Sequence, residues 1–220
     1  MSPRMTFEQE LAELRSDVAE MGTSVESVYA KLFEVLDSKN CEMMEEIIHN
    51  DRQINDMQRT IEALCLTLLT KQQPVARDLR EVSAALKVVT DIERVGDHVS
   101  DMAEVFLRMH MPVLAEFSDS LPKMVVATKE IVMDAIAAFV GKNVEAAERV
   151  IAYDDVIDAY FNQVKEDLIE DLKSGRKHPD DCIDMIMIAK YLERVGDHAV
   201  NIGEWAIFME TGDIENTRLL

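Results

Sequence analysis

Apolar residues recur every three or four positions along most of the chain, which is the spacing of amphipathic helices. The first such run begins near Phe7, passes through Leu11, Leu14 and Val18, and continues to about Asp37. The pattern predicts six long helices, at about 7–37, 41–70, 76–109, 122–140, 144–172 and 180–209. The alternation typical of half-buried strands is hard to find, and Gly (7) and Pro (5) are scarce, so an all-α fold is predicted.

Short segments with helix-ending residues separate the predicted helices. Ser38-Lys39-Asn40 and Gly141-Lys142-Asn143 occupy equivalent breaks, and Asn40 is expected to cap the helix that follows it. Gly175 is expected near the end of the fifth helix and Pro179 at the start of the sixth, as is usual for these residue types.

The chain repeats itself. The string ERVGDH runs from Glu93 to His98 and again from Glu193 to His198, at a spacing of 193 − 93 = 100 residues. Three helices in each half, with short loops, predict two tandem three-helix bundles related by a pseudo-twofold axis. We place the first bundle at 1–112 and the second at 113–220, joined by a connection at 110–122 with room for one short turn.

Each ERVGDH copy carries acidic residues along one side of its helix. At about 100° per residue, the acids of the first copy fall within one quadrant. These acids are Glu93, Asp97, Asp101 and Glu104. The opposite side is apolar, with Ile92, Val95, Val99 and Met102.

A further acidic pair, Asp154 and Asp158, lies on the helix before the second copy, where the first half has Asp51 and Asn55. Antiparallel neighbours could bring two acidic pairs together, and clustered carboxylates need either a raised pKa or a bound cation. Cations that accept oxygen ligands, namely Mg, Ca, Mn, Fe or Zn, fit such a set. The competing interpretation is a solvated acidic face, which is the usual condition of a charged stripe on a helix.

Other residues of the repeated string suggest contacts between helices. Gly96 and Gly196 each cost about 1 kcal/mol in a helix interior, so they indicate a close approach of a neighbouring helix. His98 and His198 lie off the centre of the acidic side, which favours interhelical hydrogen bonds over metal ligation. The adjacent Arg94 is expected to support the acids or to form an interhelical salt bridge, and so is Arg194.

The charge balance favours cations or basic protein surfaces as partners. The formal net charge is −20, from 43 acidic and 23 basic residues, and such a surface repels nucleic acid. Cys41, Cys65 and Cys182 are widely spaced, which is typical of reduced, mostly buried thiols in the cytosol. No signal-peptide pattern and no apolar run of 18 residues is found, so we expect a soluble cytoplasmic protein that reaches membranes only through partners.

No enzyme motif supports covalent or nucleotide chemistry. P-loop, dinucleotide-binding, nucleophile-elbow and zinc-type Cys/His patterns are all missing from the sequence. Di-iron carboxylate bundles need two E-x-x-H motifs, and this chain has one, from Glu46 to His49. We therefore expect a non-enzyme, with a metal-buffering or metal-dependent carboxylate bundle enzyme as the alternative and a plain helical scaffold as a third possibility.

Two stretches carry a family resemblance. The segment QQPVARDLREVSAALKVVTDIERVGDH, from Gln72 to His98, strongly resembles the PhoU family of phosphate-transport regulatory proteins. The segment IAKYLERVGDHAVNIGEW, from Ile188, is similar to the second repeat of the same family. The resemblance implies two three-helix bundles, metal ions or metal clusters held by E/D-x-x-x-D motifs, and dimers in many members.

The same resemblance implies a role and a set of partners. Family members act in the cytoplasm as accessory proteins and negative regulators of phosphate uptake, with the ATPase of the phosphate ABC transporter and a sensor histidine kinase as partners. Carried over by position, the metal ligands implied are Asp51, Glu93, Asp97, Asp154, Asp158, Glu193 and Asp197. Asn55 departs from the pattern, which leaves the ligand number of the first site uncertain.

Overall fold

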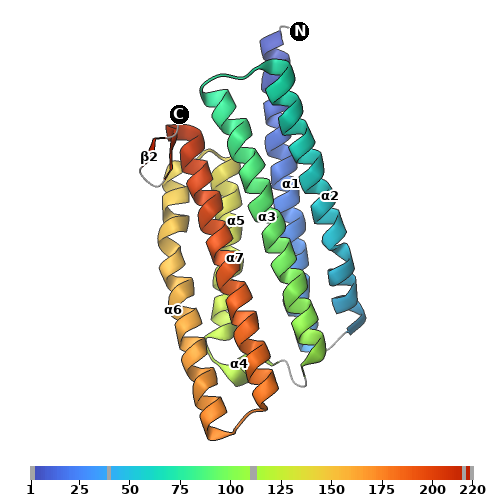
Figure 1. Cartoon of the computed structure of the whole chain (residues 1–220), viewed down its shortest axis with the longest axis vertical. Coiled ribbons are helices and arrows are strands. Elements are labelled where there is room, and N and C mark those ends of the chain that lie inside the picture. Colours follow the sequence, from blue (N-terminus) through green and yellow to red (C-terminus); the bar gives the residue numbers. More distant parts are fainter. Residues whose placement is uncertain (1–2, 39–40, 110–112, 215–216, 219–220) are drawn as a thin grey trace.

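A computed structural model describes residues 3–38, 41–109, 113–214 and 217–218 (Figure 1). The long helices are α1 (Pro3–Ser38), α2 (Cys41–Gln72), α3 (Arg77–Arg108), α5 (Leu121–Val140), α6 (Val144–Ser174) and α7 (Pro179–Thr211). The short helix α4 (Leu114–Phe117) occupies the connection between the halves, where one turn was predicted. Strands β1 (Asp213–Ile214) and β2 (Thr217–Arg218) pair antiparallel after α7. The six predicted helices are therefore confirmed, although α1 begins at Pro3 rather than near Phe7.

The helices form two three-helix bundles that pack against each other. Helix α2 packs on α1 and α3, and α6 packs on α5 and α7. The bundles meet through α3 and α7, which lie side by side and run in opposite directions, and through α1 and α5 behind them (Figure 1). The all-α architecture of two tandem bundles is thus confirmed. The residue at which one bundle gives way to the next stays a prediction.

The apolar side of the first ERVGDH helix is buried as its spacing predicts. Ile92, Val95, Val99 and Met102 are fully buried in α3. Burying each side chain of this size contributes about 1.5–3 kcal/mol. This packing fixes the rotation of α3 about its axis, and the rotation in turn decides where the acidic side points.

Polar contacts at both ends of the α3–α7 pair hold the bundles in register. At one end Arg108 Nη2 lies 2.6 Å from Asp184 Oδ1. At the other end Arg77 Nη2 lies 2.7 Å from Glu210 Oε2, and Arg80 donates to the carbonyl oxygens of Met209 and Glu210 at 3.2 Å each. These contacts place the two ERVGDH strings beside each other at the middle of the pair.

A buried carboxylate also joins the bundles. Glu81 of α3 is paired with Arg15 of α1 and, at 2.5 Å, with Lys142 in the turn between α5 and α6. Lys142 has a φ of 53°, in the left-handed region that favours glycine. The ion pair with Glu81 gives that turn a fixed attachment to the other bundle.

The helix ends follow the predicted signals. Asn143 caps α6, since its side chain accepts a hydrogen bond from the Ala146 backbone N–H at 3.0 Å. Gly175 ends α6 with a φ of 65°, and Pro179 opens α7. Asn40, the predicted cap of α2, lies outside the described residues. Within the described ranges, no helix combines the length and hydropathy needed to cross a bilayer.

Candidate functional site

The two ERVGDH strings lie half-way along α3 and α7, and each faces the outer helix of its own bundle. A Cβ atom built on Gly96 would lie 3.0 Å from Ile54 Cδ1 of α2. A Cβ atom on Gly196 would lie 3.1 Å from Ile157 Cδ1 and 3.5 Å from Asp154 Oδ1 of α6. The predicted close approach at both glycines is therefore confirmed.

Four acidic side chains come together where α6 packs on α7. We refer to Asp154, Asp158, Glu193 and Asp197 as the α6/α7 carboxylate cluster. Burial raises the pKa of Asp154 to about 6, with additional contributions from Asp158, Asp197, Asp155 and Glu193. Burial and then Glu193 also raise the pKa of Asp197. Asp154 and Glu193 are half-buried, whereas Asp158 and Asp197 are exposed. The like charges of the cluster therefore act mainly on its inner members, as the sequence suggested for clustered carboxylates.

Nearby bases only partly offset this charge. Lys190 of α7 contacts the Glu193 carboxylate from the preceding turn, and the side chain of Glu193 is 15% exposed. Arg194 makes no ion pair with any residue in the described part of the chain, and its charge acts on His98 instead. One lysine thus faces four carboxylates.

The corresponding acids of the first bundle are compensated differently. Arg94 Nη1 lies 2.7 Å from Asp97 Oδ2, and Arg94 Nε lies 3.5 Å from Glu93 Oε2. Arg94 therefore neutralises acids of its own helix instead of bridging to a neighbouring helix. Asp51 belongs to α2, but its side chain lies outside the described residues, and Asn55 is half-buried nearby in that helix.

The donor atoms of the α6/α7 carboxylate cluster fit a hard or borderline cation. All of them are carboxylate oxygens, which are the ligands that such cations take in proteins. As the side chains stand, the described residues contain no group of three or more His, Cys, Asp or Glu arranged to hold a metal. To bind a metal ion, the carboxylate side chains would have to rotate toward a common point. Glu193 would also have to leave its contact with Lys190.

The histidines of the two strings meet between the bundles. His198 Nδ1 lies 2.8 Å from Asp91 Oδ1 of α3, and Asn201 Nδ2 donates to the same oxygen at 3.1 Å. The ring centroids of His98 and His198 lie 5.5 Å apart, and the ring of Tyr191 lies at the same distance from that of His98. The predicted interhelical hydrogen bond is confirmed for His198.

Asp91 is the functional-site residue that sequence reasoning missed. It precedes the first ERVGDH string by two positions, and the repeat relates it to Tyr191, so the two halves differ there. His98 consequently has an aromatic neighbour where His198 has a carboxylate. The pKa of His98 is lowered, mainly by burial and further by the charges of His198 and Arg194. The hydrogen bond to Asp101 opposes this shift.

The single E-x-x-H motif is separate from these groups. Glu46 and His49 are both exposed on α2. His49 lines a shallow hollow with Asp17, Glu20 and Arg52, on the α1 side of that helix.

Comparisons with known proteins agree with this architecture. The sequence model described as "PhoU domain" matches the chain twice, at residues 18–106 and 121–206. A phosphate-specific transport system accessory protein PhoU homolog from Clostridium acetobutylicum is 32% identical, over 95% of this chain and 96% of its own length. PhoU homolog 1 from Thermotoga maritima is also 32% identical, over 96% and 92% of the two chains.

Solved structures give the same result. The crystal structure of the phosphate transport system regulatory protein PhoU from Streptococcus pneumoniae superposes with a TM-score of 0.87 and 30% identity. That match covers 94% of this chain and 98% of the other. The crystal structure of PhoU from Pseudomonas aeruginosa also gives 0.87, at 27% identity, over 94% and 100% of the two chains.

Proposed function

We propose that this chain, which belongs to the PhoU family, is an accessory protein that represses phosphate uptake and the phosphate-starvation response when phosphate is plentiful. Curated relatives are named as accessory proteins of phosphate-specific transport systems, and this supports an association with such a system. In our proposal the protein acts in the cytoplasm, as an adaptor and not as an enzyme. Its partners are the ATPase subunit of the phosphate ABC transporter and a sensor histidine kinase.

The observation that carries the proposal beyond the family name is the α6/α7 carboxylate cluster. Four carboxylates share one lysine, and the pKa of Asp154 rises to about 6. Clustered carboxylates repel one another unless a cation or a basic side chain neutralises them, and such clusters are common at functional sites. The cluster is therefore suited to a cation or to a basic group of a partner.

Metal binding is the first part of the mechanism. Asp154 and Asp158 of α6, with Glu193 and Asp197 of α7, would hold a divalent or trivalent ion such as Fe, Zn, Mg, Mn or Ca. The ion would neutralise the carboxylates and join the two helices. In the first bundle, Asp51, Glu93 and Asp97 would form a weaker site, because Asn55 replaces one carboxylate and Arg94 already pairs with two of the acids.

The adaptor role follows from the repeat. Helices α6, α7, α3 and α2 lie next to one another along one face of the molecule (Figure 1). In our proposal the acids of both bundles serve as contact surfaces on these helices. The acidic side of each bundle could then bind a different partner. The excess of acids over bases suits basic partner surfaces. In this proposal the protein also forms a homodimer, which sedimentation velocity would detect as a species of twice the 25.0 kDa chain mass.

The proposal is tested by deleting the gene and following a phosphate-responsive reporter. In high phosphate the reporter should be switched on in the deletion strain and repressed again when the wild-type gene is restored. Full repression in the deletion strain, with no second PhoU gene present, would contradict the regulatory role.

The rival is a metal-dependent enzyme built on the same carboxylates. Its distinguishing result is turnover of an oxidisable or phosphorylated substrate by purified protein with added metal, abolished by Asp197→Asn. Glu46 and His49 give it little support, because both are exposed on α2 and far in sequence from the cluster.

A further inference from the structure

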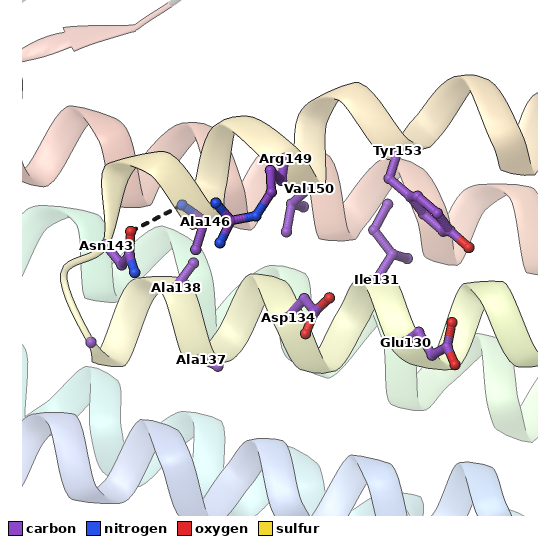
Figure 2. Close-up of a pocket in the computed structure, with 11 residues that line it drawn as sticks. Glu130, Ile131, Asp134, Ala137, Ala138, Asn143, Ala146, Arg149, Val150 and Tyr153 are labelled. Carbon is purple, nitrogen blue, oxygen red and sulfur yellow. Dashed lines mark hydrogen bonds between the residues drawn. The ribbon is translucent and has the colours of Figure 1, made fainter.

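A hollow of about 440 Å³ lies between α5 and α6 (Figure 2). It is separate from the α6/α7 carboxylate cluster, which lies where α6 packs on α7. Its volume is within the range of small-molecule sites, about 300–1,000 Å³. The turn that joins α5 to α6, with Gly141 and Asn143, closes one end. None of the roles proposed above uses this hollow.

Charges of both signs line the hollow without pairing. Arg149 of α6 extends toward the turn, whereas Asp134 and Glu130 of α5 lie farther along the groove (Figure 2). None of the three takes part in an ion pair within 4.0 Å with any residue of the described ranges, although most other arginines of those ranges do. The hollow therefore has a positive end and a negative end.

The wall between the two ends is apolar and shaped by small side chains. Ile131, Val150 and the methyl groups of Ala137, Ala138 and Ala146 line it. Ala146 lies beside Arg149 (Figure 2), so a longer side chain at this position would fill the space there. The lining suits a short hydrocarbon segment.

Tyr153 adds a hydroxyl group at the acidic end (Figure 2). A phenolic hydroxyl can donate or accept a hydrogen bond.

This arrangement is particular to the second half of the chain. The break at Asn143 matches the break at Asn40, so the offset before the second and fifth helices is 143 − 40 = 103 residues. With this offset Asp134 corresponds to Lys31 and Arg149 to Glu46, so both charges are reversed. Ala146 corresponds to Met43. The charges that line the hollow are thus particular to the second half, although a hollow beside Ser27, Val28 and Lys31 exists in the first half too.

We propose that the hollow binds a small zwitterion. Its carboxylate or phosphate group lies against Arg149, its ammonium group lies between Asp134 and Glu130, and its hydrocarbon segment lies on Ile131 and Val150. Charge-assisted hydrogen bonds at both ends give the selectivity, because a ligand with a single charge leaves one end unmatched. This inference is independent of the regulatory role and of metal binding at α6 and α7.

The test uses three probes of matched length with the uniformly ¹⁵N-labelled full chain. 5-Aminopentanoate carries both charges, pentylamine only the positive one and pentanoate only the negative one. We expect 5-aminopentanoate to shift the amide signals of Ile131, Val150 and Tyr153 saturably, and each singly charged probe to bind at least tenfold more weakly. No saturable shift of these signals, or equal binding of pentylamine or pentanoate, would overturn the proposal.

Variants separate the two ends of the site. Asp134→Asn and Arg149→Gln should each weaken 5-aminopentanoate binding at least tenfold, and Ala146→Leu should abolish it by filling the space. Glu148→Gln, on the exposed side of α6, should bind like the wild type. A melting temperature unchanged from the wild type confirms that each variant is folded, and unchanged binding by folded Arg149→Gln would contradict the assignment.

Discussion

His198 of α7 donates a hydrogen bond to the carboxylate of Asp91 of α3 across the interface between the bundles, at 2.8 Å from Nδ1 to Oδ1. The same carboxylate accepts from Asn201 at 3.1 Å. One half-buried oxygen therefore joins two positions of α7 to α3, beside the tilted pair of His98 and His198 rings. The second ERVGDH string thus contributes its acids to its own bundle and its histidine to the other.

Asp91→Ala should lower the free energy of unfolding by about 1–3 kcal/mol, because it leaves His198 and Asn201 without their shared acceptor. Urea unfolding at pH 7 measures the change. Asp101→Ala is the matched control, since its contact with His98 is longer, at 3.4 Å, and its side chain is 44% exposed. The control should change stability by less than about 0.5 kcal/mol, and equal effects of the two variants would contradict this account.

Asp154→Asn should raise the melting temperature of the metal-free protein at pH 7. The pKa of Asp154 is raised in the folded state from 3.8 to about 6, so the folded state binds more protons between these values. Stability therefore falls as the pH rises through that window, and the loss is complete above about pH 6. Thermal melts in EDTA at pH 5 and pH 7 should show a smaller pH effect for Asp154→Asn than for the wild type.

The control for this pH dependence is Glu166→Gln, an exposed acid of α6 that lies outside the α6/α7 carboxylate cluster. It should keep the wild-type pH profile. A wild-type profile for Asp154→Asn would mean that the α6/α7 carboxylate cluster does not repel itself in solution.

Titration with Mn²⁺ or Zn²⁺ should show a site that depends on the cluster. The double variant Asp154→Asn with Asp197→Asn should bind at least tenfold more weakly in calorimetry, and Asp97→Asn should weaken binding less because Arg94 already compensates that acid. Affinity should fall as the pH drops through about 6, since the ion displaces the proton of Asp154. Equal affinity of the double variant and the wild type would rule out the cluster as the site.

Gly96→Leu should destabilise the protein by about 1–3 kcal/mol, the usual cost of overpacking. A Cβ atom at Gly96 already lies 3.0 Å from Ile54 Cδ1, so a larger side chain pushes α2 away from α3. Ala159→Leu, at an exposed position of α6, is the control and should stay within about 0.5 kcal/mol of the wild type. Denaturant unfolding distinguishes the two, and a neutral Gly96→Leu would contradict the close approach of the helices.

The sequence predicts the long helices well because each buries a continuous apolar stripe, as Val95 and Val99 of α3 illustrate. Periodicity also placed Glu93 and Asp97 on the side away from that stripe. It failed at the start of α1, where Pro3 opens a helix whose first residues are not apolar at the expected spacing.

Contacts between the bundles could not be predicted in the same way. Nothing in the local pattern around Glu81 indicates that Lys142, 61 residues later, would be its partner. Asp91 likewise looks like an ordinary polar position until α3 and α7 are packed together. Such pairs depend on the rotation and offset of whole helices, and only the folded bundle fixes these.

The central claim is that the α6/α7 carboxylate cluster is needed for repression. The most direct measurement is a phosphate-responsive reporter in a strain whose only copy of the gene carries Asp154→Asn, Glu193→Gln and Asp197→Asn, compared with a strain carrying Glu166→Gln. We predict that the triple variant, present at the wild-type protein level, leaves the reporter switched on in high phosphate, and that Glu166→Gln represses it. Full repression by the triple variant at that level would contradict the account.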